Sequence, residues 1–119
     1  MNVTELRIGN YVNLIAEGHE NEPDTFQWSV DDYEFYIDRM NFINPITLTE
    51  EWLIKFGAKA RFQQTEFIYG GFRLLWKESY KYWYVIDSDS LAYLTKIEFV
   101  HEWQNFIFIL TGEELKYDN

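Results

Sequence analysis

The sequence predicts an α+β protein with a curved antiparallel sheet, for which an SH3-like curl is one option, one short central helix and one C-terminal helix. Strand-like patterns predominate, and helical patterns occur only near the centre and the end of the chain. Strands and helices do not alternate as a parallel sheet would require. The 119 residues are 47% apolar and 20% aromatic, which is enough to form a core, and their number fits a single domain over 1–119.

The first third of the chain predicts strands joined by polar segments. Residues 8–16 are rich in β-branched and aromatic side chains and predict a curling strand, with a bulge or bend at its Gly-Asn pair because both residues tolerate positive φ. Residues 17–24 predict a polar loop, and residues 25–30 predict a short strand. Residues 31–40 fit a helix and a strand equally well, so both interpretations stay open.

The clearest helix signal covers residues 50–56. Thr49 can cap its first turn, which holds two glutamates at the positive end of the helix dipole. Leu48 and Leu53 have the spacing of a hydrophobic staple. Gly57 stands where a helix commonly ends in the left-handed conformation.

The region from Arg61 to Asp87 predicts antiparallel hairpins. The pair Gly70-Gly71 indicates a two-residue turn of type I′, in which both residues need positive φ. Its register pairs residues of one face: Tyr69 with Phe72, Phe67 with Leu74, and Thr65 with Trp76. A turn near Glu78 then leads into a strand over 80–86. Both faces of this strand carry large side chains: Trp83 and Val85 on one, Tyr80, Tyr82 and Tyr84 on the other.

The last predicted element is a helix near residues 100–111. Its apolar residues fall on one arc of a helical wheel: Phe99, Val100, Trp103, Phe106, Ile107 and Leu110. Gly112 again has the position of a left-handed terminating glycine. Residues 95–98 match a capping box, but they equally fit the end of a strand that enters the helix near Val100.

Composition argues against several classes of function. The chain has no cysteine, and its ten basic and twenty acidic residues leave a net charge of −10. This balance argues against nonspecific binding to DNA, RNA or anionic membranes, so we expect no direct nucleic-acid binding and no membrane partner. The start of the chain has no secretory signal pattern, and the longest apolar run, residues 106–110, is too short to span a bilayer. We therefore expect a cytoplasmic protein.

No residue pattern predicts an active site, a metal site or a cofactor site. Glu20, Glu22 and Asp24 alternate as in a calcium loop, but Thr25 and Asp31 stand where an EF-hand needs glycine and glutamate. The two histidines, His19 and His101, are far apart in sequence, and we expect His101 to face solvent on the last helix. No nucleophile, phosphate-loop or dinucleotide motif is present. We therefore expect a protein that is not an enzyme, with no catalytic residues, no metal and no cofactor.

Two groups of residues are candidates for binding a partner. The first third is acidic and includes Asp31, Asp32, Glu34 and Asp38, which either attract a basic protein or only keep an aromatic protein soluble. Tyr80, Tyr82 and Tyr84 suit an interface or a stacked ligand, and the alternative is a second core layer. Phe108 and Ile109 lie outside the apolar arc of the last helix, and a homodimer interface is the plain hypothesis for them.

Three segments together resemble a family of small uncharacterised proteins of gut Bacteroidetes, their mobile elements and their phages. They are Glu5 to Val12, Pro45 to Gly57, and Val100 to Leu115 without residues 107–109. The resemblance covers about a third of the chain and implies a cytoplasmic accessory protein, often carried by phage, with no catalytic residues to transfer. Residues 6–12 also resemble the first strand of SH3-like barrels.

We therefore expect a small non-enzymatic protein-binding module, a phage or mobile-element accessory factor that acts on a host protein through an acidic, aromatic surface. The alternative is a small-molecule or nucleotide-binding protein with an aromatic pocket near the hairpins of residues 61–87. A phosphorylated ligand would require basic residues to gather around that pocket: Arg61, Arg73, Lys77 and Lys81.

Overall fold

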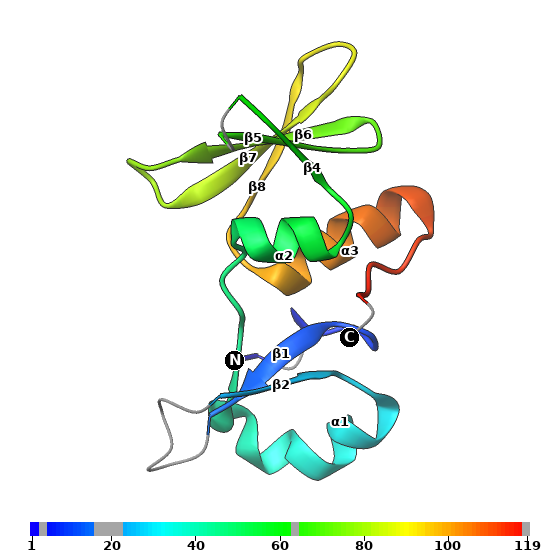
Figure 1. Ribbon diagram of the computed structural model, residues 1–119. Coiled ribbons are helices and arrows are strands. Elements are labelled where there is room, and N and C mark those ends of the chain that lie inside the picture. Colours follow the sequence, from blue (N-terminus) through cyan, green and yellow to red (C-terminus); the bar gives the residue numbers. More distant parts are fainter. Residues whose placement is uncertain (3–4, 16–22, 63–64, 118–119) are drawn as a thin grey trace. The chain divides into compact units, whose positions relative to one another are not determined.

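The computed structural model describes residues 1–2, 5–15, 23–62 and 65–117 (Figure 1). Its contacts divide the chain into two compact units. Unit 1 comprises Met1–Thr47 and Phe99–Leu115, and unit 2 comprises Leu48–Glu98 and Lys116–Asn119. The predicted single domain over 1–119 stays a prediction.

Unit 1 is built on a three-stranded antiparallel sheet of order β2-β1-β3. Its strands are β1 (Tyr11–Leu14), β2 (Asp24–Gln27) and β3 (Ile43–Asn44). Its helices are α1 (Val30–Tyr36), the 3₁₀ helix η2 (Ile37–Phe42) and α3 (Val100–Thr111). Leu6, Val12, Trp28 and Ile43 form a buried cluster of this unit.

The strand predicted over 8–16 begins only at Tyr11 because Gly9 turns the chain with φ +101°. The bend predicted at this glycine is therefore confirmed. The predicted loop at 17–24, with His19 and the calcium-like acids Glu20 and Glu22, lies outside the described residues as far as residue 22. The short strand predicted over 25–30 is β2, but it ends at Gln27, and Val30 already begins α1.

The open question about residues 31–40 is decided in favour of helix. Asp32 lies in the first turn of α1, and its carboxylate accepts hydrogen bonds from the backbone N–H and the hydroxyl of Ser29, at 2.8 and 2.9 Å. An acidic residue at this end of a helix also favours the helix dipole. The chain continues into η2 as far as Phe42.

Unit 2 is a five-stranded antiparallel sheet of order β4-β5-β6-β7-β8 with one helix. Its elements are α2 (Glu50–Lys55), β4 (Lys59–Arg61), β5 (Glu66–Tyr69), β6 (Phe72–Lys77), β7 (Tyr82–Asp87) and β8 (Tyr93–Ile97). One face of the sheet is buried, and it carries Phe67, Leu74, Trp83, Val85 and Ile97. The indole N–H of Trp83 donates to the carbonyl of Leu48 at 2.9 Å.

The local signals of unit 2 are confirmed, with three small differences. The strand predicted over 80–86 is β7, which begins only at Tyr82 and leaves Tyr80 in the preceding turn. Thr49 caps α2 by accepting from the N–H of Trp52 at 3.4 Å, and the helix ends one residue before the predicted residue 56. The hairpin pairs Tyr69 with Phe72 as predicted. Gly70 has φ +55° but Gly71 is not left-handed, so the φ pattern matches type II′ and the prediction of type I′ is wrong.

Helix α3 begins at Val100, directly after a strand. Residues 93–97 form β8, so the strand interpretation is correct and the capping box predicted at 95–98 is wrong. The Glu102 carboxylate instead accepts from the N–H of Phe99 at 2.9 Å. Gly112 ends the helix with φ +75° as predicted.

The buried side of α3 differs from the predicted arc. Val100, Trp103 and Ile107 are buried, but Leu110 is 54% exposed. His101 is only 4% exposed, so the prediction that it faces solvent is wrong. The imidazole stacks on the ring of Phe99, with centroids 5.9 Å apart, which the helical wheel alone does not predict. Helix α3 also packs along β1, where the side chain of Gln104 accepts from the N–H of Tyr11.

The α+β class with antiparallel sheets is confirmed. The strands form two sheets, and neither sheet closes into a barrel over the residues described, so the SH3-like option is not realised. Within the same residues, no helix is long and apolar enough to cross a bilayer.

Candidate functional site

The candidate site is the exposed face of the five-stranded sheet in unit 2. Directly paired residues of antiparallel strands point to the same side, so the register identifies the residues of each face. We call this face the tyrosine face. Its first cross-strand row is Arg61, Glu66, Leu75, Tyr84 and Lys96. Its second row is Lys59, Ile68, Arg73, Ile86 and Tyr93, and its third is Lys77 with Tyr82.

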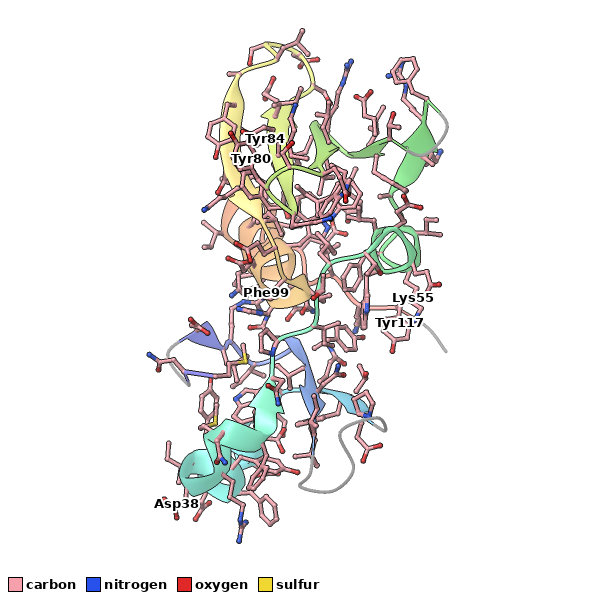
Figure 2. The ribbon with its side chains drawn as sticks, turned by 90° about the vertical axis from the view of Figure 1, so that its left-hand side faces the viewer. Asp38, Lys55, Tyr80, Tyr84, Phe99 and Tyr117 are labelled. Carbon is pink, nitrogen blue, oxygen red and sulfur yellow. The ribbon has the colours of Figure 1, made fainter. Side chains whose placement is uncertain are left out.

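Four tyrosine rings form a continuous track on this face. Tyr80, from the turn before β7, stacks on Tyr82 with ring centroids 5.6 Å apart and an interplanar angle of 16°. The ring of Tyr82 lies 5.1 Å from that of Tyr84, which in turn lies 5.4 Å from that of Tyr93. Tyr80 and Tyr93 are 66% and 58% exposed. Figure 2 shows Tyr80 and Tyr84 together on one side of the β7 region, well apart from Lys55 and Tyr117 beside α2.

Basic side chains accompany the rings. The Lys77 ammonium lies 5.1 Å from the centroid of Tyr84, and the Lys96 ammonium lies 5.3 Å from that of Tyr82. These distances are typical of cation–π contacts. Lys59 and Arg61, also exposed, extend the basic character toward the β4 edge.

One carboxylate lies among the paired residues of the tyrosine face. Glu66 is 6% exposed, and it forms an ion pair with Arg73 at 3.5 Å. Lys81 lies in the turn between β6 and β7, where it pairs with Glu78. Of the four basic residues that a phosphorylated ligand would require, Arg61, Arg73 and Lys77 are on the tyrosine face. The fourth, Lys81, pairs with Glu78 in the turn.

The centre of the tyrosine face is an open hollow rather than a deep pocket. Tyr82, Tyr84, Ile86 and Tyr93 line a volume of about 560 Å³ that is wide open to solvent. The hydroxyl of Tyr82 donates to the hydroxyl of Tyr84 at 3.1 Å. This hydrogen bond, with partial burial and the neighbouring phenols, raises the pKa of Tyr82 to about 12. Tyr82 is therefore an uncharged donor near neutral pH.

The predicted segregation of the two faces of β7 is confirmed. Trp83 and Val85 are 3% and 0% exposed, and the tyrosines of the same strand face the other side. Tyr93 and Lys96 belong to the same surface but were missed as candidates. The pairing of β8 with β7 identifies them. The sequence did not reveal this pairing, because residues 95–98 fit both the end of a strand and the cap of a helix.

The acidic candidates lie elsewhere in the chain. Asp31, Glu34 and Asp38 are exposed on α1 and η2 of unit 1, and Asp32 is engaged with Ser29. Figure 2 labels Asp38 on this helical segment. Unit 1 contains two basic and twelve acidic residues and so accounts for the entire charge of −10, whereas unit 2 contains eight of each.

The candidate oligomer interface is exposed at the end of α3. Phe108 and Ile109 are 38% and 78% exposed. The guanidinium of Arg7 lies 4.0 Å from the centroid of the Phe108 ring, so Phe108 already has a partner within unit 1. The homodimer stays a prediction.

Among the described residues, no group of three histidine or acidic side chains is placed to hold a metal ion. His101 is buried against the ring of Phe99, with centroids 5.9 Å apart, and burial lowers its pKa.

Comparison with known proteins adds no family or function. The chain matches no protein-family model, no curated protein and no solved structure. The candidate site therefore rests on the geometry of the tyrosine face alone.

Proposed function

We propose that this chain is a non-enzymatic binding module of the cytoplasm whose contact surface is the tyrosine face. The observation that carries the proposal is the unbroken track of four tyrosine rings on a sheet face that remains exposed while the opposite face is buried. Tyrosine offers a large contact area at a small cost in conformational entropy, and it is enriched at binding surfaces.

The basic residues indicate the charge of the partner. Lys59, Arg61, Lys77 and Lys96 are exposed on this face, and its one carboxylate among the paired residues is buried and paired. Opposite potentials attract and orient binding partners, so a surface of this charge favours an anionic ligand. The open hollow suits an extended ligand better than a small molecule that must be enclosed.

Inorganic polyphosphate is a suitable first probe because it carries negative charge without rings. We expect backbone amide shifts in β6, β7 and β8 when it is added to the isotopically labelled chain, and binding that weakens as salt is raised. The double variant Lys77→Glu/Lys96→Glu should abolish these shifts. The control variant Lys55→Glu/Lys116→Glu changes the net charge by the same amount as Lys77→Glu/Lys96→Glu, but on other parts of unit 2. It should retain most of the amide shifts.

Two results would contradict the proposal. One is the absence of shifts on the tyrosine face with polyphosphate and with every other anionic ligand tried. The other is an equal loss of binding in both charge-matched variants, because binding would then depend on total charge and not on this surface.

A second candidate, a basic protein partner for unit 1, is favoured by the concentration of the whole net charge in that unit. This candidate corresponds to the sequence-based hypothesis of an accessory factor that acts on a host protein. Polylysine should shift α1 amides, and Asp31→Asn/Glu34→Gln/Asp38→Asn should weaken its binding by tenfold or more. If the matched triple variant Glu50→Gln/Glu51→Gln/Asp89→Asn in unit 2 weakens binding equally, the acidic residues form no specific site.

A further inference from the structure

The tyrosine rings offer separate stacking surfaces rather than one continuous stack. Successive centroids along the track are 5.6, 5.1 and 5.4 Å apart, but only Tyr80 and Tyr82 are near parallel, at 16°, and the next two pairs of rings meet at 66° and 88°. A duplex keeps its bases parallel at about 3.4 Å per step, whereas unpaired bases can turn one by one onto aromatic side chains. The orientation of the rings therefore favours single-stranded over duplex nucleic acid.

The basic residues are placed to contact phosphates beside such bases. Lys77 and Lys96 lie in the cross-strand rows of Tyr82 and Tyr84 respectively. Each lysine now rests against a tyrosine ring and has a flexible stem, so an incoming base can replace the ammonium on the ring while the ammonium turns to the phosphate. Lys59 and Arg61 on β4 extend the basic surface across the sheet.

The net charge of −10 does not argue against binding at this face. The excess negative charge belongs entirely to unit 1, and unit 2 is balanced. Within unit 2, the exposed charged side chains of the paired residues on the tyrosine face are basic, so a phosphate in contact with this face meets positive charge. The expectation of no nucleic-acid binding depended on the charge of the whole chain.

The shape of the face favours nucleic acid over an acidic protein segment. The hollow is shallow, open and lined by three rings and one isoleucine, so it offers stacking surfaces rather than a deep pocket for one side chain. Stacking is available to every base, so the preference among sequences should be small.

We infer that the tyrosine face binds single-stranded nucleic acid, with bases stacked on Tyr80, Tyr82, Tyr84 and Tyr93 and phosphates contacted by the basic residues around them. This inference rests on the proposed function and names its ligand.

Fluorescence anisotropy of a labelled ten-nucleotide oligouridylate with the full chain tests the inference. Substitution of one stacking ring typically weakens binding roughly tenfold or more, so we expect that loss for Tyr82→Leu and for Tyr84→Leu. Tyr117→Leu, a change beside α2, should leave the affinity within twofold. If three to five phosphates are contacted, the logarithm of the affinity should fall with the logarithm of salt with a slope of about −2 to −3.5. Circular dichroism and urea midpoints verify that each variant is folded.

Binding of three further ligands tests the inference separately from the proposed function. An abasic oligomer of equal length and a duplex should both bind at least tenfold more weakly than the oligouridylate. Equal binding of either one would overturn the inference and leave an anion-binding face intact. A polyglutamate peptide that binds this face more tightly than the oligouridylate would also overturn it, in favour of an acidic protein partner. If no anionic ligand shifts the amides of β6 to β8, both proposals fail.

Discussion

Arg7 and Glu114 form a bidentate ion pair that joins two segments 107 positions apart in the sequence. The two terminal nitrogens of Arg7 donate to the two carboxylate oxygens of Glu114 at 2.8 and 2.7 Å. The Arg7 Nε also donates to the side-chain oxygen of Asn105 at 3.0 Å, and the guanidinium covers the ring of Phe108. All four residues belong to unit 1, so the pair fixes its N-terminal segment to the end of α3 and the residues that follow it.

Arg7→Lys should destabilise unit 1 by about 1–2 kcal/mol, because lysine cannot reproduce the paired hydrogen bonds of the guanidinium and both side chains of the pair are mostly shielded. Urea unfolding followed by tryptophan fluorescence measures the change. Lys81→Gln removes the most exposed of the ion pairs described and should not change the midpoint measurably. Equal midpoints for Arg7→Lys and the unaltered chain would show that the pair does not stabilise the fold.

Gly9→Ala should be more damaging than an ordinary glycine substitution. Gly9 has φ +101°, and a Cβ atom there would lie 1.9 Å from a carboxylate oxygen of Glu114. We expect a loss of roughly 1–3 kcal/mol from backbone strain and from displacement of the Glu114 side chain. Gly71→Ala is the matched control, because its φ is not left-handed and no atom lies within 4 Å of the added Cβ. Similar urea midpoints for the two variants would contradict the close approach at Gly9.

Gln104→Met keeps the length of a fully buried side chain but removes its hydrogen bonds. The side-chain oxygen of Gln104 accepts from the N–H of Tyr11 at 2.8 Å, and its nitrogen donates to the carbonyls of Gly9 and Leu115 at 3.0 and 2.9 Å. Loss of partners for buried backbone groups should cost about 2 kcal/mol or more. Amide hydrogen exchange at Tyr11 should accelerate in the variant, and unchanged exchange there would be the contrary result. Asn13→Ala, at a half-exposed site in the same strand, should leave the exchange at Tyr11 close to normal.

His101 should make the stability of the protein depend on pH in the mildly acidic range. Burial lowers the pKa of His101 below the ordinary value of 6.5, and the carboxylates of Glu102 and Glu5 oppose this shift. The unfolded chain therefore takes up a proton at a higher pH than the folded chain, so stability falls as the pH drops below about 6.5. Above that pH the imidazole is neutral in both states and contributes no pH dependence.

His101→Leu removes the titrating group from this buried position and should reduce the loss of stability between pH 7.5 and pH 5.5. Urea midpoints of both proteins at these two pH values give the comparison, since acidic residues titrate alike in the two chains. An identical loss in both proteins would show that protonation of His101 does not oppose folding.

The first and the last of the three resemblance segments contact each other within unit 1. Arg7, Gly9 and Asn10 come from the first segment, and Gln104, Asn105 and Glu114 come from the last. No local pattern predicts these contacts, because each residue alone is an ordinary polar or flexible position. These contacts are consistent with a structural role for the first and last segments.

Several elements were determined by the sequence alone because their causes are local. The cap at Thr49, the hairpin at Gly70 and the helix end at Gly112 depend on side chains and backbone angles within a few residues of each site. The common direction of Tyr82 and Tyr84 likewise follows from the two-residue period of any strand.

Only the tertiary structure decided which residues share a surface and which are buried. Tyr93 and Lys96 join the tyrosines because β8 pairs with β7, and His101, which was expected to face solvent, is buried against the ring of Phe99. Contacts between distant segments also assign the acidic candidates to unit 1 and the tyrosine face to unit 2. The physical reason is that strand pairing and helix packing depend on contacts between distant segments, whereas sequence patterns report only the preferences of neighbours.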